Sequence, residues 1–241
     1  MTDKGISFVI ALFQFVILLF SLSFHECAHA WMASRLGDQT ARLQGRVSLN
    51  PVRHIDPIGT LLFPALMIFG PLLGMGGTGF LIGWAKPTPV ITRNFKHIRR
   101  DDNLTTLAGP VSNLILVIAS FILLVILMVA VPGGEDAVIS AANFQLNQNG
   151  ESALQAVALL GYLAIEVNLA LMFFNLLPIP PLDGSHVLRN MLPYNALNTY
   201  DQIGRFGFIL IIILGRYIVP FFMNPAIGVV DAGLSLFLHR G

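Results

Sequence analysis

Apolar residues occur along this sequence in stretches much longer than a helix or strand of a water-soluble core needs. A helix of about 20 apolar residues crosses a bilayer core about 30 Å thick. Four stretches approach that length, although Glu166 and Arg216 lie inside the last two. The pattern predicts membrane helices over residues 6–36, 104–131, 153–177 and 206–222, followed by a short amphipathic helix from Asn224 onward.

A further apolar stretch, Ile58–Trp84, does not have the composition of a plain membrane helix. It contains seven glycines and two prolines, Pro64 and Pro71. Both residue types disfavour a continuous helix. Irregular backbone at membrane depth is tolerated where protein buries it or where it lines a wet cavity. We therefore expect a re-entrant loop or a tight hairpin here, with a single irregular crossing as the alternative.

Two polar stretches contain extended patterns. Within Thr40–Leu49, apolar and polar residues alternate on both sides of Gln44 and Gly45. This alternation predicts a short β-hairpin. Residues 87–92 begin Pro-Thr-Pro-Val, which predicts a second extended piece. Either edge would be available to pair with another extended chain.

The charged residues between the apolar stretches predict an orientation in the membrane. The connection Arg35–Asp56 contains four arginines, and Lys86–Asp102 contains five basic residues. The loop Pro132–Ser152 contains three acids and neither lysine nor arginine. Because cytoplasmic loops are enriched in Lys and Arg, we place the first two connections in the cytoplasm and the third outside. The stretch 58–84 would then begin and end on the same side.

Composition narrows the possible functions. Of 241 residues, 55% are hydrophobic and 11% are charged, whereas soluble domains have about 25% charged residues. A multi-pass membrane protein follows, with a lipid bilayer around it and no expected nucleic acid or nucleotide. A single cysteine, Cys27, excludes an internal disulfide and a zinc site built from several thiolates. We expect one membrane-embedded domain, residues 1–241, with its core in 6–184 and a C-terminal membrane segment and tail in 185–241.

The first membrane helix ends in the pattern H-E-x-x-H. His25 and His29 lie four residues apart, so they share one face of a helix and can bind the same ion. Glu26 is close enough to reach a water molecule held by that ion, as in zinc proteases. A secretory signal peptide is the alternative interpretation. Its apolar core would have 7–15 residues, whereas Ile6–Phe24 is longer and further membrane stretches follow it.

A catalytic zinc needs a third protein ligand, and Asp183 is the best candidate. It follows a proline-rich sequence that ends a membrane helix, and Gly184 permits a tight turn directly after it. The charge-based topology brings Asp183 and the H-E-x-x-H motif to the same membrane face. Considered without the motif, Asp183 would be an ordinary turn residue.

Four other residues are weaker candidates. His186 follows Asp183 closely and is either near the ion or an interfacial histidine. His54 lies in a basic loop, where we expect solvation or a local hydrogen bond. Glu166 lies in the middle of a membrane stretch, which makes it a functional candidate. Arg216 would pair with an acid or mark a helix break.

Three motifs together resemble the site-2 protease family of intramembrane zinc metalloproteases, in its short form without a PDZ domain. They are His25–His29, the sequence G-P-V-S-N ending at Asn113, and the sequence N-x-x-P-x-P-x-L-D-G from Asn175 to Gly184. The resemblance covers residues 6–184 with the motifs in the family's order.

The resemblance implies a core of three membrane helices, which correspond to residues 6–36, 104–131 and 153–177. It implies that His25, His29 and Asp183 bind one catalytic zinc ion and that Glu26 is the catalytic base. It further implies that Asn113 and Asn175 bind the substrate backbone. A bacterial plasma membrane suits the short form, with the active site near the cytoplasmic face.

The predicted function is hydrolysis of peptide bonds in or near transmembrane segments of membrane proteins, in signalling or in turnover. A non-catalytic metal-binding scaffold is one alternative, but zinc binding alone would not require Glu26. A transporter is the other, supported by a broken helix together with Glu166 and Arg216. The sequence lacks the paired broken segments of a repeat transporter, and that function leaves H-E-x-x-H without a role.

Overall fold

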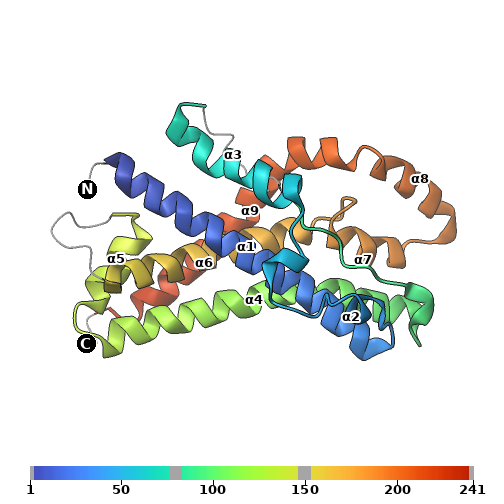
Figure 1. Ribbon diagram of the computed structural model, residues 1–241, viewed down its shortest axis with the longest axis horizontal. Coiled ribbons are helices and arrows are strands. Elements are labelled where there is room, and N and C mark those ends of the chain that lie inside the picture. The colour runs from blue at the N-terminus through green and yellow to red at the C-terminus, as the bar shows by residue number, and fades with distance from the viewer. Residues whose placement is uncertain (1–2, 76–82, 146–152, 239–241) are drawn as a thin grey trace.

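A computed structural model describes residues 3–75, 83–145 and 153–238, and all of the regular structure in these ranges is helical (Figure 1). The longest helices are α1 (Asp3–Leu36), α4 (Ile98–Ala130), α6 (Ala153–Asn175) and α9 (Gly207–Ser235). Each contains an apolar segment long enough to cross a membrane. The multi-pass, all-helical class predicted from the sequence is thus confirmed.

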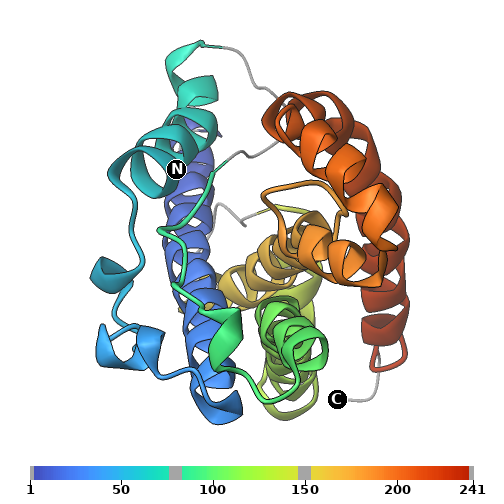
Figure 2. The same ribbon diagram turned by 90° about the vertical axis from the view of Figure 1, so that its right-hand side faces the viewer.

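The helices α1, α4 and α6 contact one another, and α9 packs against α6 and α4. Viewed along the bundle, α3 (Phe63–Phe69) lies beside α1 on one side, while α8 (Tyr194–Gly204) and α9 lie on the other (Figure 2). At the end of the bundle that contains α5 (Gly134–Ala142), the described residues pack through apolar side chains. Leu124 and Leu163 are fully buried there.

The predicted end of the last membrane helix was wrong. We expected a span ending at Phe222 and a separate helix from Asn224. Instead α9 continues through Pro220 and Pro225 to Ser235, and its membrane-length apolar segment is Tyr217–Ser235. Apolar residues after Pro225 pack against the core, so tertiary burial outweighs the local effect of the prolines. Likewise, the polar loop 132–152 contains α5, whose buried Ala137, Val138 and Ala141 share one face.

The predicted β-hairpin at Thr40–Leu49 was wrong. Residues Thr40–Leu43 form the short helix α2, and a turn follows at Gly45, where φ is +70°. Asp38 accepts hydrogen bonds from both the backbone N–H and the hydroxyl of Thr40, which favours a helical turn. Leu43 is 84% exposed, so the alternating residues do not bury one face as a strand would.

The irregular stretch 58–84 begins and ends at the same place. The Trp84 N–H donates to the Gly59 carbonyl at 3.1 Å, and a Cβ on Gly59 would overlap the Trp84 ring. Between these residues, a π-helical turn (Pro57–Leu62) and α3 rise along α1, so that the Phe69 ring lies 5.8 Å from that of Phe8. The two ends of the stretch therefore meet, and the re-entrant path stays a prediction. Residues 76–82 lie outside the described part.

An extended segment, residues 83–91 and hereafter the strap, passes along α1. Its residues form neither helix nor strand, and the backbone of Ile91 is extended. The Lys86 N–H donates to the His54 carbonyl at 2.8 Å, and the Ile91 N–H donates to Asp38 Oδ2 at 2.7 Å. Burial alone would raise the pKa of Asp38, but hydrogen bonds from Ile91, Thr40 and Asn94 hold it below its usual value. The buried Asp38 carboxylate therefore fixes one end of the strap.

Candidate metal centre and active site

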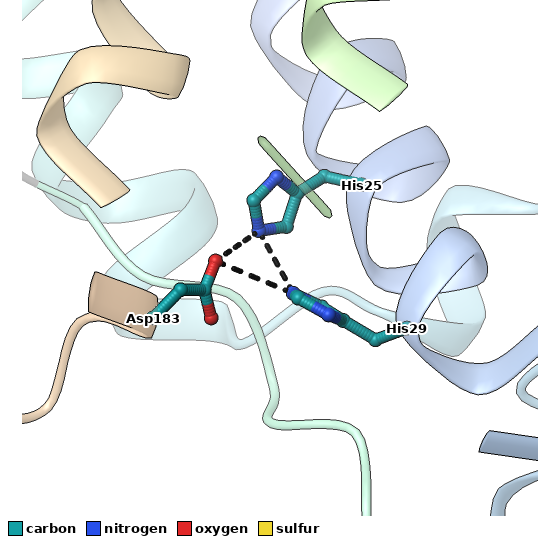
Figure 3. Close-up of side chains that lie close together, drawn as sticks. All are labelled: His25, His29 and Asp183. Carbon is teal, nitrogen blue, oxygen red and sulfur yellow. Dashed lines mark hydrogen bonds and ion pairs between the residues drawn. The ribbon is translucent and has the colours of Figure 1, made fainter. Parts of the chain in front are cut away.

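Three possible metal ligands converge where α1 meets α7 (Asp183–Met191) (Figure 3). The Nε2 atoms of His25 and His29 are 3.0 Å apart. Asp183 Oδ2 lies 3.1 Å from His25 Nε2 and 3.4 Å from His29 Nε2. The side chains of His25 and His29 are buried. The structure thus brings together the three ligands predicted from the sequence, although more than 150 positions separate Asp183 from the histidines.

Local structure explains this convergence. His25 and His29 lie one turn apart on α1, and Asp183 is the first residue of α7, directly after the proline-rich turn. Gly184 allows α7 to begin tightly against the end of α6, because a Cβ there would overlap the carbonyl of Leu176. A larger residue at this position would push Asp183 away from the histidines.

Both imidazole rings are oriented through their second nitrogen. His25 Nδ1 lies 2.7 Å from Asn113 Oδ1, and His29 Nδ1 lies 2.8 Å from the Thr105 carbonyl oxygen. Each of these oxygens accepts a hydrogen bond, so each Nδ1 carries the proton. The unprotonated Nε2 atoms then face each other and Asp183. Metal-binding histidines in proteins characteristically have such a contact on the other nitrogen.

The arrangement fits a cation. Two imidazole lone pairs and a carboxylate oxygen this close together repel one another unless a positive charge lies among them. A Cβ on Gly109 would overlap the Nε2 atoms of both histidines, so this glycine of α4 makes room for the ligand set.

Glu26 is held by the strap. Its Oε2 atom accepts hydrogen bonds from the Thr88 N–H at 3.1 Å and from the Thr88 hydroxyl at 2.7 Å. Both groups are neutral donors, and they fix the carboxylate at the wall of the cavity that contains the histidines. Sequence reasoning missed Thr88, because no pattern within residues 83–91 relates it to a glutamate 62 positions earlier.

A cavity of about 480 Å³ opens onto these groups. Its lining includes the proposed ligands and Glu26, residues of the strap from Gly83 to Val90, and parts of α4, α6 and α7. The cavity thus brings together one candidate metal site, one carboxylate and an extended segment of backbone. Among the residues that the structure describes, His25, His29 and Asp183 are the group suited to bind a metal.

Comparison with known proteins identifies the family. The profile of Peptidase family M50 matches residues 13–214, which is most of the chain. The chain belongs to peptidase family M50. The site-2 protease resemblance predicted from the three motifs is therefore confirmed.

Curated relatives of this M50 member carry related names. "Putative zinc metalloprotease YwhC" of Bacillus subtilis (strain 168) is 36% identical over 214 residues, which cover 88% of this chain and 84% of the relative. "Putative zinc metalloprotease Rip2" of Mycolicibacterium smegmatis is 30% identical over 196 residues, covering 81% of this chain and 63% of the relative. The protein of the same name in Mycobacterium tuberculosis H37Rv is 28% identical over 198 residues. No solved structure matches the chain.

The two asparagines implied by the family resemblance have different surroundings in this M50 member. Asn113 is fully buried, contacts His25, and is not among the residues that line the cavity. Asn175 lines the cavity, and its Nδ2 donates to the Leu171 carbonyl at 2.9 Å. The contact of Asn113 favours a role in orienting His25. A substrate-binding role for Asn175 stays a prediction.

The weaker candidates are divided between the site and its surroundings. His186 lines the cavity, whereas His54 is buried and its Nε2 lies 2.8 Å from the Ser48 carbonyl oxygen, the local bond expected for it. Cys27 is outside the candidate metal group, as expected. Glu166 lines a second cavity. The Arg216 side chain lies outside the described part of the structure.

Proposed function

We propose that this chain is an intramembrane zinc metalloprotease, in which His25, His29 and Asp183 bind one zinc ion and Glu26 is the general base. The observation that carries the proposal is the convergence of two Nε2 atoms and one carboxylate oxygen at 3.0–3.4 Å. Membership of the M50 family and the names of its relatives support zinc as the metal. Two imidazoles and one carboxylate leave a coordination position open, as catalytic zinc requires.

The residues of this chain would divide the work of hydrolysis. Zinc, when bound, activates water and polarises the peptide carbonyl. Glu26 takes the proton of the attacking water and passes it to the leaving amine. The two hydrogen bonds from Thr88 keep one carboxylate oxygen, Oε2, fixed during this transfer. Asn113 and the Thr105 carbonyl hold the imidazoles in one tautomer and one orientation.

The proposed substrate is a transmembrane segment of another membrane protein. A helix hides its peptide bonds, so the substrate must unwind at the site before hydrolysis. The strap runs beside Glu26 in an extended conformation and offers backbone groups to an unwound chain. The four arginines within Arg35–Asp56 support a cytoplasmic position of this end of the bundle, in a plasma membrane.

The test is cleavage by the purified chain in lipid vesicles. A single-span substrate is incubated with the wild type, with the wild type after a zinc chelator, and with Glu26→Gln. We expect cleavage by the untreated wild type alone, and recovery on adding zinc back after chelation. Asp136→Asn, in α5 at the other end of the bundle, is the matched control and should cleave as the wild type does. Cleavage that survives both chelation and Glu26→Gln would refute the proposal.

A further inference from the structure

A second cavity, of about 230 Å³, lies next to the catalytic one at membrane depth. Its walls come from α1, α6 and α9 together with Pro64 and the first residue of the strap. The two cavities are adjacent, because four residues line both: Leu22, Gly83, Leu171 and Phe174. The second cavity therefore lies directly beside the place where a chain would bind at the catalytic site.

The second cavity is apolar except for two side chains. Gln14 projects from α1 and Glu166 from α6. Neither side chain forms a hydrogen bond or ion pair with another side chain that the structure describes. By contrast, the neighbouring acid on α9, Asp231, accepts a hydrogen bond from the Tyr162 hydroxyl at 2.9 Å. Unpaired polar groups in a membrane interior are unfavourable, which points to a partner that arrives with a ligand.

The two polar side chains lie at a similar depth. Gln14 precedes His25 by 11 residues and Glu166 precedes Asn175 by 9. At 1.5 Å per residue, these separations are about 16 Å and 14 Å along parallel helices. That distance corresponds to about 10 residues of a helical substrate or about 5 residues of an extended one. The cavity is thus in reach of the same transmembrane segment whose peptide bond lies at the zinc site.

From these observations we propose that Gln14 and Glu166 form a substrate subsite. It binds one hydrogen-bond-donating side chain, a hydroxyl or an amide, located about 5–10 residues from the scissile bond on the membrane side. The subsite rests on the proposed protease function and adds a rule of substrate choice to it. The chain would select transmembrane segments that contain a polar residue at this distance over segments that are apolar throughout.

The test uses single-span substrates with a polyleucine segment in which one leucine is replaced by asparagine at each position in turn. The readout is the ratio of the kcat/KM for the asparagine substrate to that for the all-leucine substrate, measured in vesicles. For the wild type, we expect a ratio of about three to ten within the 5–10 residue window, the size of a hydrogen bond between membrane helices. The ratio should fall to about one in Glu166→Leu and Gln14→Leu, and should largely persist in Glu166→Gln.

A glycine scan of the same substrate separates recognition from easier unwinding. Glycine weakens the substrate helix but donates no side-chain hydrogen bond. An equal ratio for glycine and asparagine at the same position, or an asparagine ratio that persists in Glu166→Leu, would overturn the subsite. So would a wild-type ratio of one at every position.

A binding measurement separates failure of the subsite from failure of the protease. The inactive variant Glu26→Gln and its double variant with Glu166→Leu are titrated with the fluorescent asparagine and all-leucine peptides in lipid nanodiscs. We expect tighter binding of the asparagine peptide by the single variant alone, whether or not the wild type cleaves. Destabilisation of the fold by Glu166→Gln, with no asparagine preference in the single variant Glu26→Gln, would assign Glu166 to the fold instead.

Discussion

The two ends of the helical bundle are built from the same helices but differ in the side chains between them. At the α5 end, α4 and α6 face each other through buried apolar residues such as Leu124 and Leu163. At the α7 end, α1 and α4 face each other through His25, Asn113 and Gly109. Packing of one end holds the helices together, whereas the other end contains charge, hydrogen bonds and a cavity.

The difference shows how a membrane protein can keep a polar site. The apolar end fixes the spacing of the helices, so the site end can contain groups that do not pack tightly. At the site end, buried polar side chains mostly have a specific partner, and those partners come from different helices or from the strap. Substitutions at the two ends should therefore separate stability from activity.

The largest effect is expected at the site end. Glu26→Gln keeps the shape of the side chain but removes the general base, so the cleavage rate should fall by about 10²–10⁴. Bound zinc and the thermal unfolding midpoint should remain as in the wild type, because Glu26 is outside the ligand set. Zinc loss in this variant would show that Glu26 is a ligand, which would break the proposed division of roles.

The reverse pattern is expected at the apolar end. Leu163→Ala removes a fully buried side chain and should lower the free energy of unfolding by about 2–5 kcal/mol. The cleavage rate per folded molecule should change by less than a factor of two at a temperature well below unfolding. A large drop in that rate would show that the two ends are coupled, which contradicts their separation.

The contact between Asn113 and His25 should affect zinc affinity. Asn113→Leu leaves His25 Nδ1 without its acceptor, so zinc should bind about 10–100-fold more weakly. The comparison variant is Ser112→Ala, which removes a neighbouring buried hydroxyl on the same helix that bonds only to the Gly109 carbonyl. Competition with a fluorescent chelator measures both. Equal affinities for the two variants would assign Asn113 to packing, or to the substrate, and not to the metal.

The smallest effect is expected at the strap. Thr88→Val removes the hydroxyl bond to Glu26 but keeps the backbone one. The cleavage rate should fall about two- to tenfold, as for loss of one hydrogen bond, and Thr88→Ser should restore it. An unchanged cleavage rate in Thr88→Val would show that the Thr88 hydroxyl does not support Glu26.

Patterns within the sequence were sufficient to predict the elements that depend on local periodicity. The helical spacing of His25 and His29, the long apolar stretches and the break before Asp183 all follow from residues close together in the chain. The charge of the connecting loops then predicted that Asp183 and the histidines lie at the same membrane face. The bounds of three of the four long helices were predicted to within a few residues, except for the polar first turns of α4.

What the sequence did not predict depends on distant contacts. The prediction of a hairpin at Thr40–Leu49 was wrong because alternation of apolar and polar residues does not reveal whether one face will be buried. In addition, Asp38 favours a helical turn there. The predicted end of α9 was wrong because packing against the core outweighs the helix-breaking tendency of Pro225. Thr88 contacts Glu26 through its hydroxyl, and Thr105 contacts His29 through its backbone carbonyl. Such groups are common in any sequence, so these contacts become apparent only in the folded structure.

The most direct test of the central claim is an X-ray absorption spectrum of zinc bound to the purified chain, recorded for the wild type and for Asp183→Asn. The account predicts one zinc per wild-type chain, with two histidine nitrogens and oxygen ligands at about 2.0–2.2 Å and no sulfur. Asp183→Asn should lose most of the zinc or show one oxygen fewer. A sulfur ligand at about 2.3 Å from Cys27, or a wild-type spectrum in Asp183→Asn, would contradict the proposed ligand set.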